Sequence, residues 1–482
     1  MHMKMLTPRR TRVWLGLLLS FVAPRCACFD QLYRALGAPE RPPTRLSALR
    51  RSQPAFAVAS REDDPRKLTV LLKDAASPRE LFGLYADHST TFNHIHISAI
   101  WISFSKLARG RGRPRKLEKE FGKLCLHTQD MASTGEMGSR GLSNCMYALA
   151  KAGIRGKDTP ELLDALAAAG VSGVGDFEPQ ALSNSVWAFA TAGHASPTLF
   201  DALAAASVSQ IGDFNPQALS NTAWAFAKAD HASPALFDAL AVASVSRVGD
   251  FLPQALANTA WAFATAGHAP PALFDALAAA AATLLGDFDP QALAITAWAF
   301  ATAGHATPAL FDAAIAQRCE AGKATEARYG TRHLAQLHQW ILWSAERDLP
   351  SGVSAAFSQR CRAAFVADSP SPSRLQREVV TTLAALGLSP REEVRTAEGY
   401  TIDAVVEWQG ATVGIEVDGP SHFHGRAPTG ATMLKRRQLA TLGGWRLISV
   451  PYWEWASFRG DERRQQEYLH WALYAALRAR VT

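Results

Sequence analysis

The chain has 482 residues, of which 48% are apolar and 19% charged, and its formal net charge is +7 at pH 7. This composition is that of a globular protein and excludes a disordered or collagen-like chain. The length leaves room for two or three domains with ample core. Residues 1–60 carry ten Lys and Arg residues against two acids, so the basic balance belongs mainly to this segment.

Residues 1–60 have the pattern of a targeting leader. Basic residues precede the apolar run VWLGLLLSFV, which is too short to cross a bilayer and is typical of a signal-peptide core. The stretch from Phe29 onward is rich in Arg, Ser, Ala and Pro and poor in acids, as transit peptides are. The combination resembles the bipartite leaders of proteins sent to plastids bounded by extra membranes.

A mitochondrial presequence and a plain secretory signal are the alternatives for this leader. The four cysteines beyond it are widely scattered and show neither a disulfide framework nor zinc-ligand spacing, which favours a reducing organelle interior. We expect a linker at residues 61–91, and no membrane attachment once the leader is removed.

The middle of the chain contains four near-identical units of 37 residues, marked by Trp187, Trp224, Trp261 and Trp298. Each unit predicts two helices, since a Pro opens each helix and a Gly, or Asp230 in one unit, ends the first. Asn215 and Asp289 are expected to cap two of the first helices. Neither helix can bury its apolar stripe alone, so neighbouring units must stack.

Weaker copies flank these four units, and we expect about seven helix pairs between residues 92 and 366. The predicted fold of this region is an α-solenoid of helical-hairpin repeats. Its Trp and Phe residues are expected in the core, with base stacking as the alternative. Asn184, Asn221 and Asn258, replaced by Ile295 in the fourth unit, are candidates for contacting a base edge, although a structural bond between repeats is the competing interpretation.

Charge argues against a phosphate-binding groove in the repeats, because residues 175–312 hold two basic and eleven acidic residues. A protein partner for this acidic segment is therefore one hypothesis. If RNA binds, its phosphates must be held mainly by the flanks. One flank offers Arg109 and a set of further cations in a Gly-rich run, interpreted as a basic loop in a degenerate repeat rather than as an AT-hook. The set comprises Arg111, Arg113, Arg115 and Lys116.

From about residue 373 the pattern changes to helix, strand hairpin, helix and strand. The strands YTIDAVVEW and ATVGIEVDG meet at Gln409-Gly410, a basic helix follows, and WRLISVPYWEW is predicted as the last strand. This order is the minimal core of a restriction-endonuclease-like fold. Asp403, Glu416 and Asp418 fall on the adjacent strands, as carboxylates that hold Mg²⁺ in hydrolases must.

The runs IDAVVEW, IEVDGPSHF, TGATMLKRRQL and GWRLISVPYWEW resemble a RAP domain, here placed at residues 373–475. The 37-residue units are similar to octotricopeptide or FAST-kinase-like repeats, which such domains typically follow. The resemblance implies an organellar RNA-binding protein that acts in processing, stability or translation of chloroplast or mitochondrial transcripts, including ribosomal RNA.

By this resemblance, Asp403, Glu416 and Asp418 match acids that RAP domains share with Vsr-like nucleases. Asp418 stands where the standard site has Lys, so Lys435 is the candidate substitute. A Mg²⁺-dependent endoribonuclease would hold its metal with Asp403 and Glu416. The favoured interpretation is a fold that only binds, needs no cofactor, and pairs these acids with Arg436 or Arg437.

A candidate RNA surface completes the C-terminal predictions. Cations would hold phosphate while exposed rings stack on bases. At least one of Trp453 and Trp455 is expected in the core instead. The residues assigned to this surface are His422, His424, Lys435, Arg436, Arg437, Tyr452 and Trp453.

Overall fold

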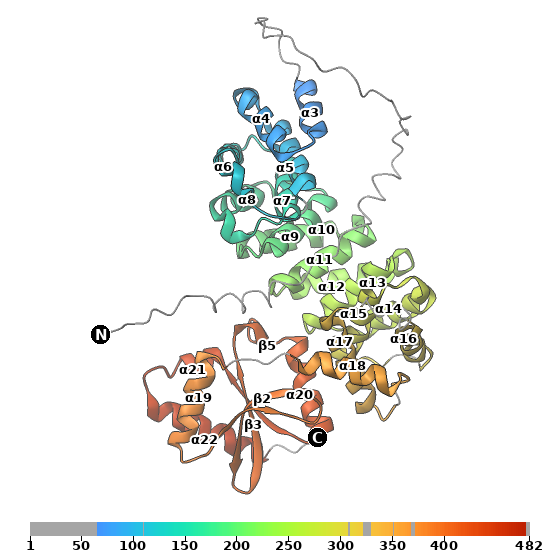
Figure 1. Cartoon of the computed structure of the whole chain (residues 1–482), viewed down its shortest axis with the longest axis vertical. Coiled ribbons are helices and arrows are strands. Elements are labelled where there is room, and N and C mark those ends of the chain that lie inside the picture. Colours follow the sequence, from blue (N-terminus) through green and yellow to red (C-terminus); the bar gives the residue numbers. More distant parts are fainter. Residues whose placement is uncertain are drawn as a thin grey trace, which may run out of the picture. The chain divides into compact units, whose positions relative to one another are not determined.

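The computed structural model describes residues 65–108, 110–306, 309–321, 329–349, 351–367 and 372–478. The predicted leader and Arg109 lie outside the described residues. Stacked helix pairs are followed by a small sheet covered by helices (Figure 1). The predicted α-solenoid with a C-terminal α/β domain is confirmed. Within the described part, no helix combines the length and the apolar character that crossing a membrane requires.

Seven helix pairs make up the solenoid within the described residues, and we call the first helix of each pair A and the second B. The A-helices are α5 (His94–Ala108), α7 (Ser139–Ala152), α9 (Pro179–Ala192), α11 (Pro216–Ala229), α13 (Pro253–Thr265), α15 (Pro290–Ala303) and α17 (Thr331–Glu346). The B-helices are α6 (Glu118–Ser133), α8 (Pro160–Ser172), α10 (Pro197–Ser209), α12 (Pro234–Arg247), α14 (Pro271–Leu284), α16 (Ala309–Ala321) and α18 (Ala355–Val366).

Local signals set the ends of the A-helices as predicted. The Asn215 side chain accepts a hydrogen bond from the Ala218 amide at 2.8 Å, and Asp289 accepts one from the Ala292 amide at 2.7 Å. Each of the four repeats then ends its A-helix with a residue of positive φ, which lets the chain leave the helix. These residues are Gly193, Asp230, Gly267 and Gly304.

Consecutive A-helices pack closely side by side, whereas consecutive B-helices contact each other much less. This difference places the A-helices on the inner side of the solenoid. Short 3₁₀ turns connect α8, α10, α12 and α14 to the next A-helix, in η4 (Val174–Asp176), η5 (Ile211–Asp213), η6 (Val248–Asp250) and η7 (Leu285–Asp287).

The repeat aromatics are core residues, as expected. Trp224, Trp261 and Trp298 are 9%, 6% and 6% exposed, and the phenylalanine two positions after each is fully buried. Trp187 is half-buried and packs on Tyr147, with ring centroids 5.3 Å apart. Rings this covered do not provide platforms for base stacking.

The predicted linker at residues 61–91 is corrected by the structure. It contains α3 (Pro65–Asp74), α4 (Pro78–His88) and the 3₁₀ turn η1 (Ser89–Thr91). Leu72 of α3 and Phe82 of α4 are buried in the same core as the repeats. Ser77 caps α4 by accepting a hydrogen bond from the Glu80 amide at 3.2 Å, a start signal that the charged composition of the segment obscured.

The C-terminal domain has a four-stranded sheet of order β1-β2-β3-β6. Strands β2 and β3 form the predicted hairpin, and both of its turn residues, Gln409 and Gly410, have positive φ. Strand β6 is parallel to β3, because α20 crosses between them. The strands are β1 (Arg391–Arg395), β2 (Thr401–Trp408), β3 (Ala411–Asp418) and β6 (Arg446–Pro451), with a small hairpin of β4 (Phe423–His424) and β5 (Ala427–Pro428).

Helices α19 (Arg374–Ala385) and α22 (Glu462–Arg478) pack on one face of this sheet, and α20 (Gly430–Gly443) lies on the other. Strand β1 and helix α22 were not predicted. The predicted last strand ends earlier than expected, because Pro451 closes the pairing with Asp418 and begins the short helix α21 (Tyr452–Ala456). Trp455 of α21 is 2% exposed and belongs to the core, as one of the two tryptophans was expected to.

Candidate functional site

The three predicted acids lie on two neighbouring strands beneath helix α20. Asp403 lies on β2, while Glu416 and Asp418 lie on the neighbouring strand β3 and are 3% and 1% exposed. Lys435 of α20 places its Nζ 2.6 Å from Glu416 Oε2, so it occupies the position suggested for a substitute lysine. We call these four residues the acid cluster.

Further hydrogen bonds fix the cluster. The Val417 amide donates to Asp403 Oδ2 at 2.7 Å, and the Ser449 hydroxyl donates to Asp418 Oδ2 at 2.5 Å. Arg436 also donates to Asp418 Oδ2, at 2.5 Å, as the pairing hypothesis expected. Cations from α20 therefore neutralise two of the three carboxylates.

Burial dominates the protonation behaviour of the cluster. It raises the pKa of Glu416 to about 7, against the lowering effect of the Lys435 ammonium, and Asp403 and Asp418 raise it further. Burial also raises the pKa of Asp403 and lowers that of the neighbouring His422. Glu416 is thus an acid whose protonation changes near neutral pH.

The carboxylates of the acid cluster do not form a Mg²⁺ site in this arrangement. Within the described residues, no three His, Cys, Asp or Glu side chains converge in a way that could hold a metal ion. Lys435 occupies one oxygen of Glu416 and the Val417 amide one oxygen of Asp403. Mg²⁺ requires near-octahedral oxygen ligation, and an ammonium 2.6 Å from a ligand oxygen competes with it.

An aromatic group lies at the end of the sheet beside the acid cluster. The His422 side chain is 41% exposed, and its Nδ1 lies 3.2 Å from Asp418 Oδ1. The half-buried rings of Tyr452 and Trp453 pack with Phe423, whose centroid is 4.3 Å from that of Trp453. Tyr452 and Trp453 are thus adjacent, His422 precedes their partner Phe423 in the chain, and each of the three keeps some exposed surface for a ligand.

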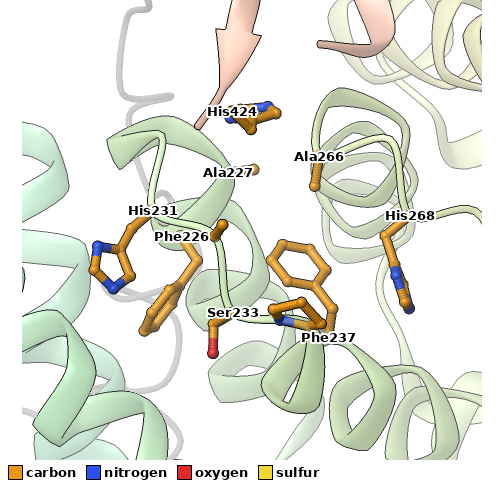
Figure 2. Close-up of a pocket in the computed structure, with 10 residues that line it drawn as sticks. Phe226, Ala227, His231, Ser233, Phe237, Ala266, His268 and His424 are labelled. Atoms are coloured by element: carbon orange, nitrogen blue, oxygen red, sulfur yellow. The ribbon is translucent and has the colours of Figure 1, made fainter. Parts of the chain in front are cut away.

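His424 has a different position from the predicted RNA surface. Its Nδ1 contacts the Asp230 carboxylate at the end of α11, and its Nε2 lies 2.9 Å from the Thr265 carbonyl of α13. Figure 2 shows the ring facing the loops after α11 and α13, over a small pocket that these loops line. His424 therefore joins the C-terminal domain to the solenoid, and its assignment to RNA is corrected.

The assignment of Arg437 to the RNA surface is corrected in the same way. Its guanidinium bonds the Ala301 carbonyl, the Thr302 carbonyl at 3.4 Å and Glu346 Oε2 at 3.2 Å. Both carbonyls lie in the last turn of α15, where a cation complements the helix dipole. All its guanidinium nitrogens have partners inside the protein, so Arg437 holds the domain in place.

A buried polar network that sequence analysis missed completes this junction. Gln339 of α17 accepts from Trp298 Nε1 and donates to the Tyr400 hydroxyl, both at 2.9 Å. Tyr400 donates to Gln438 Oε1 at 2.8 Å, and Gln438 donates to the Gln339 carbonyl at 2.8 Å. No local sequence signal pairs these residues, because the bonded partners lie 38 to 99 positions apart in the chain.

The basic loop, defined as residues 110–117, joins α5 to α6. The Gly112 amide donates to the Ala152 carbonyl at the end of α7 at 2.8 Å, which fixes the loop on the C-terminal end of an A-helix. Arg113 pairs with Glu118 at 2.9 Å. All four predicted cations of the loop are exposed: Arg111, Arg113, Arg115 and Lys116.

The predicted asparagines lie on the A-helices at partly exposed positions. Asn184, Asn221 and Asn258 each lie one turn after a Gln and one turn before a Trp, on one face of the A-helix. Asn144 of α7 holds the equivalent position and was missed, although the LSN motif of its unit was visible. We call these four residues the asparagine row.

The acids of the repeats are segregated from this face. Helices α5, α7, α9, α11, α13 and α15 contain no Asp or Glu. One Asp on each of the helices α8, α10, α12 and α14 pairs with the His of the following repeat, at 2.7 to 3.0 Å, and a second lies in each 3₁₀ turn η4 to η7. Burial, together with Arg332 and Arg155, lowers the pKa of Lys228 on α11, so cations lie near each other on the inner side.

Comparison with known proteins agrees with this architecture. A family model described as RNA-editing substrate-binding complex 6 protein matches residues 88–338, more than half of the chain, and a RAP domain model matches residues 415–470. A RAP domain-containing protein, chloroplastic, from Oryza sativa subsp. japonica is 36% identical over 121 residues, which are 25% of this chain and only 17% of that relative. The chain therefore belongs to the RNA-editing substrate-binding complex 6 protein family and carries a RAP domain at its C-terminal end.

Proposed function

We propose that this protein binds single-stranded RNA along the A-helix side of its solenoid and acts in organellar RNA processing. The observation that carries the proposal is the absence of acids from α5 through α15 on the A side. Most acids of the repeats lie on the B-helices and in the 3₁₀ turns, while Glu178, Asp230 and Asp289 lie at the ends of A-helices. The length of the A-helices α5 to α15 therefore carries no acid that would repel a phosphate chain on the inner side. Lys151, Lys228 and Arg332 add positive charge there.

The RNA backbone would be held at two places on this side. The basic loop contributes four exposed cations at the end of α5. The RAP domain contributes partly exposed Lys435 and Arg436, with His422, Tyr452 and Trp453 beside them for stacking on bases. Phosphate contacts supply affinity, and aromatic contacts tolerate any base.

The names of the matched family and of the relative support the biological setting. The family is described as protein 6 of an RNA-editing substrate-binding complex, and the relative as chloroplastic. We place the protein in a plastid, with a mitochondrion as the alternative, and its targets among organellar messenger or ribosomal RNAs. A fluorescent fusion of residues 1–60 that enters neither organelle would contradict this placement.

Crosslinking followed by sequencing of bound RNA from fractionated organelles tests the function. We expect discrete transcripts to be recovered. Uniform background RNA, together with stable capture of a protein by residues 175–312, would favour a protein-interaction scaffold instead.

A further inference from the structure

The asparagine row extends over four consecutive repeats. Asn144, Asn184, Asn221 and Asn258 occupy the same position in α7, α9, α11 and α13, and each is partly exposed. These helices pack directly side by side. With helix axes about 8–10 Å apart, the four carboxamides form a regular row across the inner side.

The row is not used to hold the repeats together. That role belongs to the serine before each of the first three asparagines: Ser143, Ser183 and Ser220 donate to carbonyls of the next A-helix at 3.2, 3.4 and 3.3 Å. Within the described residues, the four carboxamides have no hydrogen-bond partner. Their donors and acceptors are therefore available to a ligand.

The surroundings of the row repeat as well. In α9, α11 and α13 a Gln lies one turn before the Asn and a Trp one turn after it. Helical-repeat proteins that contact one base per repeat select that base with two or three side chains. Repeats with identical side chains at these positions must select the same base each time.

Both ends of the row have structural causes. In α15, Ile295 replaces Asn, and the neighbouring Trp298 is engaged through Gln339 with the RAP domain. In α5 the corresponding stretch, residues 97–101, contains no asparagine and is buried throughout. The row therefore offers four equivalent positions and no more within the described repeats.

We propose that the asparagine row recognises an uninterrupted run of about four adenines in single-stranded RNA. A carboxamide presents one donor edge and one acceptor edge, which match the N7 acceptor and N6 donor of adenine. The inference rests on the RNA binding proposed above and specifies its substrate. It also explains why α9, α11 and α13 share the same Gln, Asn and Trp, since a mixed target would require different side chains.

Fluorescence anisotropy with the full chain tests this inference. The probes are ten-nucleotide RNAs of equal composition, one with four adjacent adenines between cytosines and one with the same adenines separated by cytosines. We expect about tenfold tighter binding of the adjacent arrangement, equivalent to one good base contact. Equal affinities, or tighter binding of four uracils or guanines in the same frame, would overturn the inference. Failure to bind any of these RNAs would instead contradict the proposed function.

A single substitution separates recognition from folding. Asn221→Ala is expected to remove most of the preference for adjacent adenines and to leave binding of the separated arrangement unchanged. Its melting temperature should equal that of the wild type, because the carboxamide has no partner to lose. Ser246→Ala, an exposed change on α12 of the same repeat, is the matched control. A loss of affinity that is the same for both RNAs in Asn221→Ala would count against base recognition.

Discussion

The carboxylate of Asp230 contacts the imidazole of His424, although 194 residues separate them in the chain. Asp230 replaces the glycine that ends the A-helix in the three sister repeats, and it keeps the same left-handed backbone, with φ of 57°. An L-residue pays about 1 kcal/mol for this conformation. The contact with the RAP domain gives that residue a function that glycine could not provide.

Asp230→Gly is predicted to loosen the junction without unfolding the repeat. The lost contact costs about 1 kcal/mol, since Asp230 is partly exposed, and the relief of backbone strain offsets a similar amount. Hydrogen exchange should accelerate in β4, β5 and the start of α20, with little change in melting temperature. Asp238→Ala, which removes the pair between Asp238 of α12 and His268 of the following repeat, should not accelerate exchange in β4, β5 or α20.

The junction should weaken as pH rises. Burial lowers the pKa of His424, but Asp230 and the Thr265 carbonyl raise it more, so it lies above the ordinary 6.5. A raised histidine pKa stabilises the folded state fully below about pH 6.5 and loses this effect as pH passes the folded value. Exchange in β4 and β5 should increase between pH 6 and pH 8.5 in the wild type. A pH profile that is the same in His424→Gln would contradict this assignment.

Lys435 and Glu416 should behave as a coupled buried pair. Lys435→Met leaves a buried carboxylate without its cation and is expected to lower the free energy of unfolding by about 2 kcal/mol. Glu416→Gln in the same chain should restore most of the loss. Additive effects in this double-mutant cycle would show that the two side chains do not interact.

Glu416 predicts a second pH dependence, which arises from an acid that stays protonated in the folded state. Its folded pKa of about 7 exceeds the unfolded 4.5, so the folded state keeps a proton that the unfolded state releases. Stability should therefore fall as pH rises from about 4.5 to 7. The unfolding free energy of wild type and of Glu416→Gln should be measured across this range, and the difference between them should change with pH. The difference between wild type and Glu407→Gln, a control on the exposed end of β2, should not change in this way.

The endoribonuclease alternative can be tested directly. Since Lys435 and the Val417 amide occupy ligand oxygens, we expect no Mg²⁺-dependent cleavage of bound RNA, and unchanged binding in Asp403→Asn and Glu416→Gln. Cleavage that requires Mg²⁺ and disappears in both variants would establish the nuclease.

Sequence patterns predicted the parts of this molecule that depend on local chemistry. Asn215, Asp289 and the glycines after the A-helices act within one turn, and Gln409-Gly410 determines its own hairpin. The strand predicted through Trp455 failed because Pro451 ends the pairing, which outweighs the β preference of the aromatic residues that follow.

The site was harder to predict, because its contacts join distant segments. The acids and Lys435 lie within 33 residues of each other, and their grouping follows from the β2–β3 hairpin and the helix α20 after it. The roles of His424 and Arg437 depend on partners in α11 and α15, which no local pattern indicates. Net charge was misleading as well, because a sum over residues 175–312 cannot show that most of the acids lie on the B-helices and turns and none within the A-helices α9 to α15.

The most direct test of RNA binding on the A side is the salt dependence of RNA affinity after removal of the basic loop's charge. Neutralising Arg111, Arg113, Arg115 and Lys116 should weaken binding and reduce the slope of log affinity against log salt by up to about 3, since each single-strand phosphate contact contributes about 0.7. The matched control neutralises four exposed cations elsewhere: Lys119, Lys123, Arg463 and Arg464. An unchanged affinity and slope in the loop variant, or an equal loss in the control, would contradict the account.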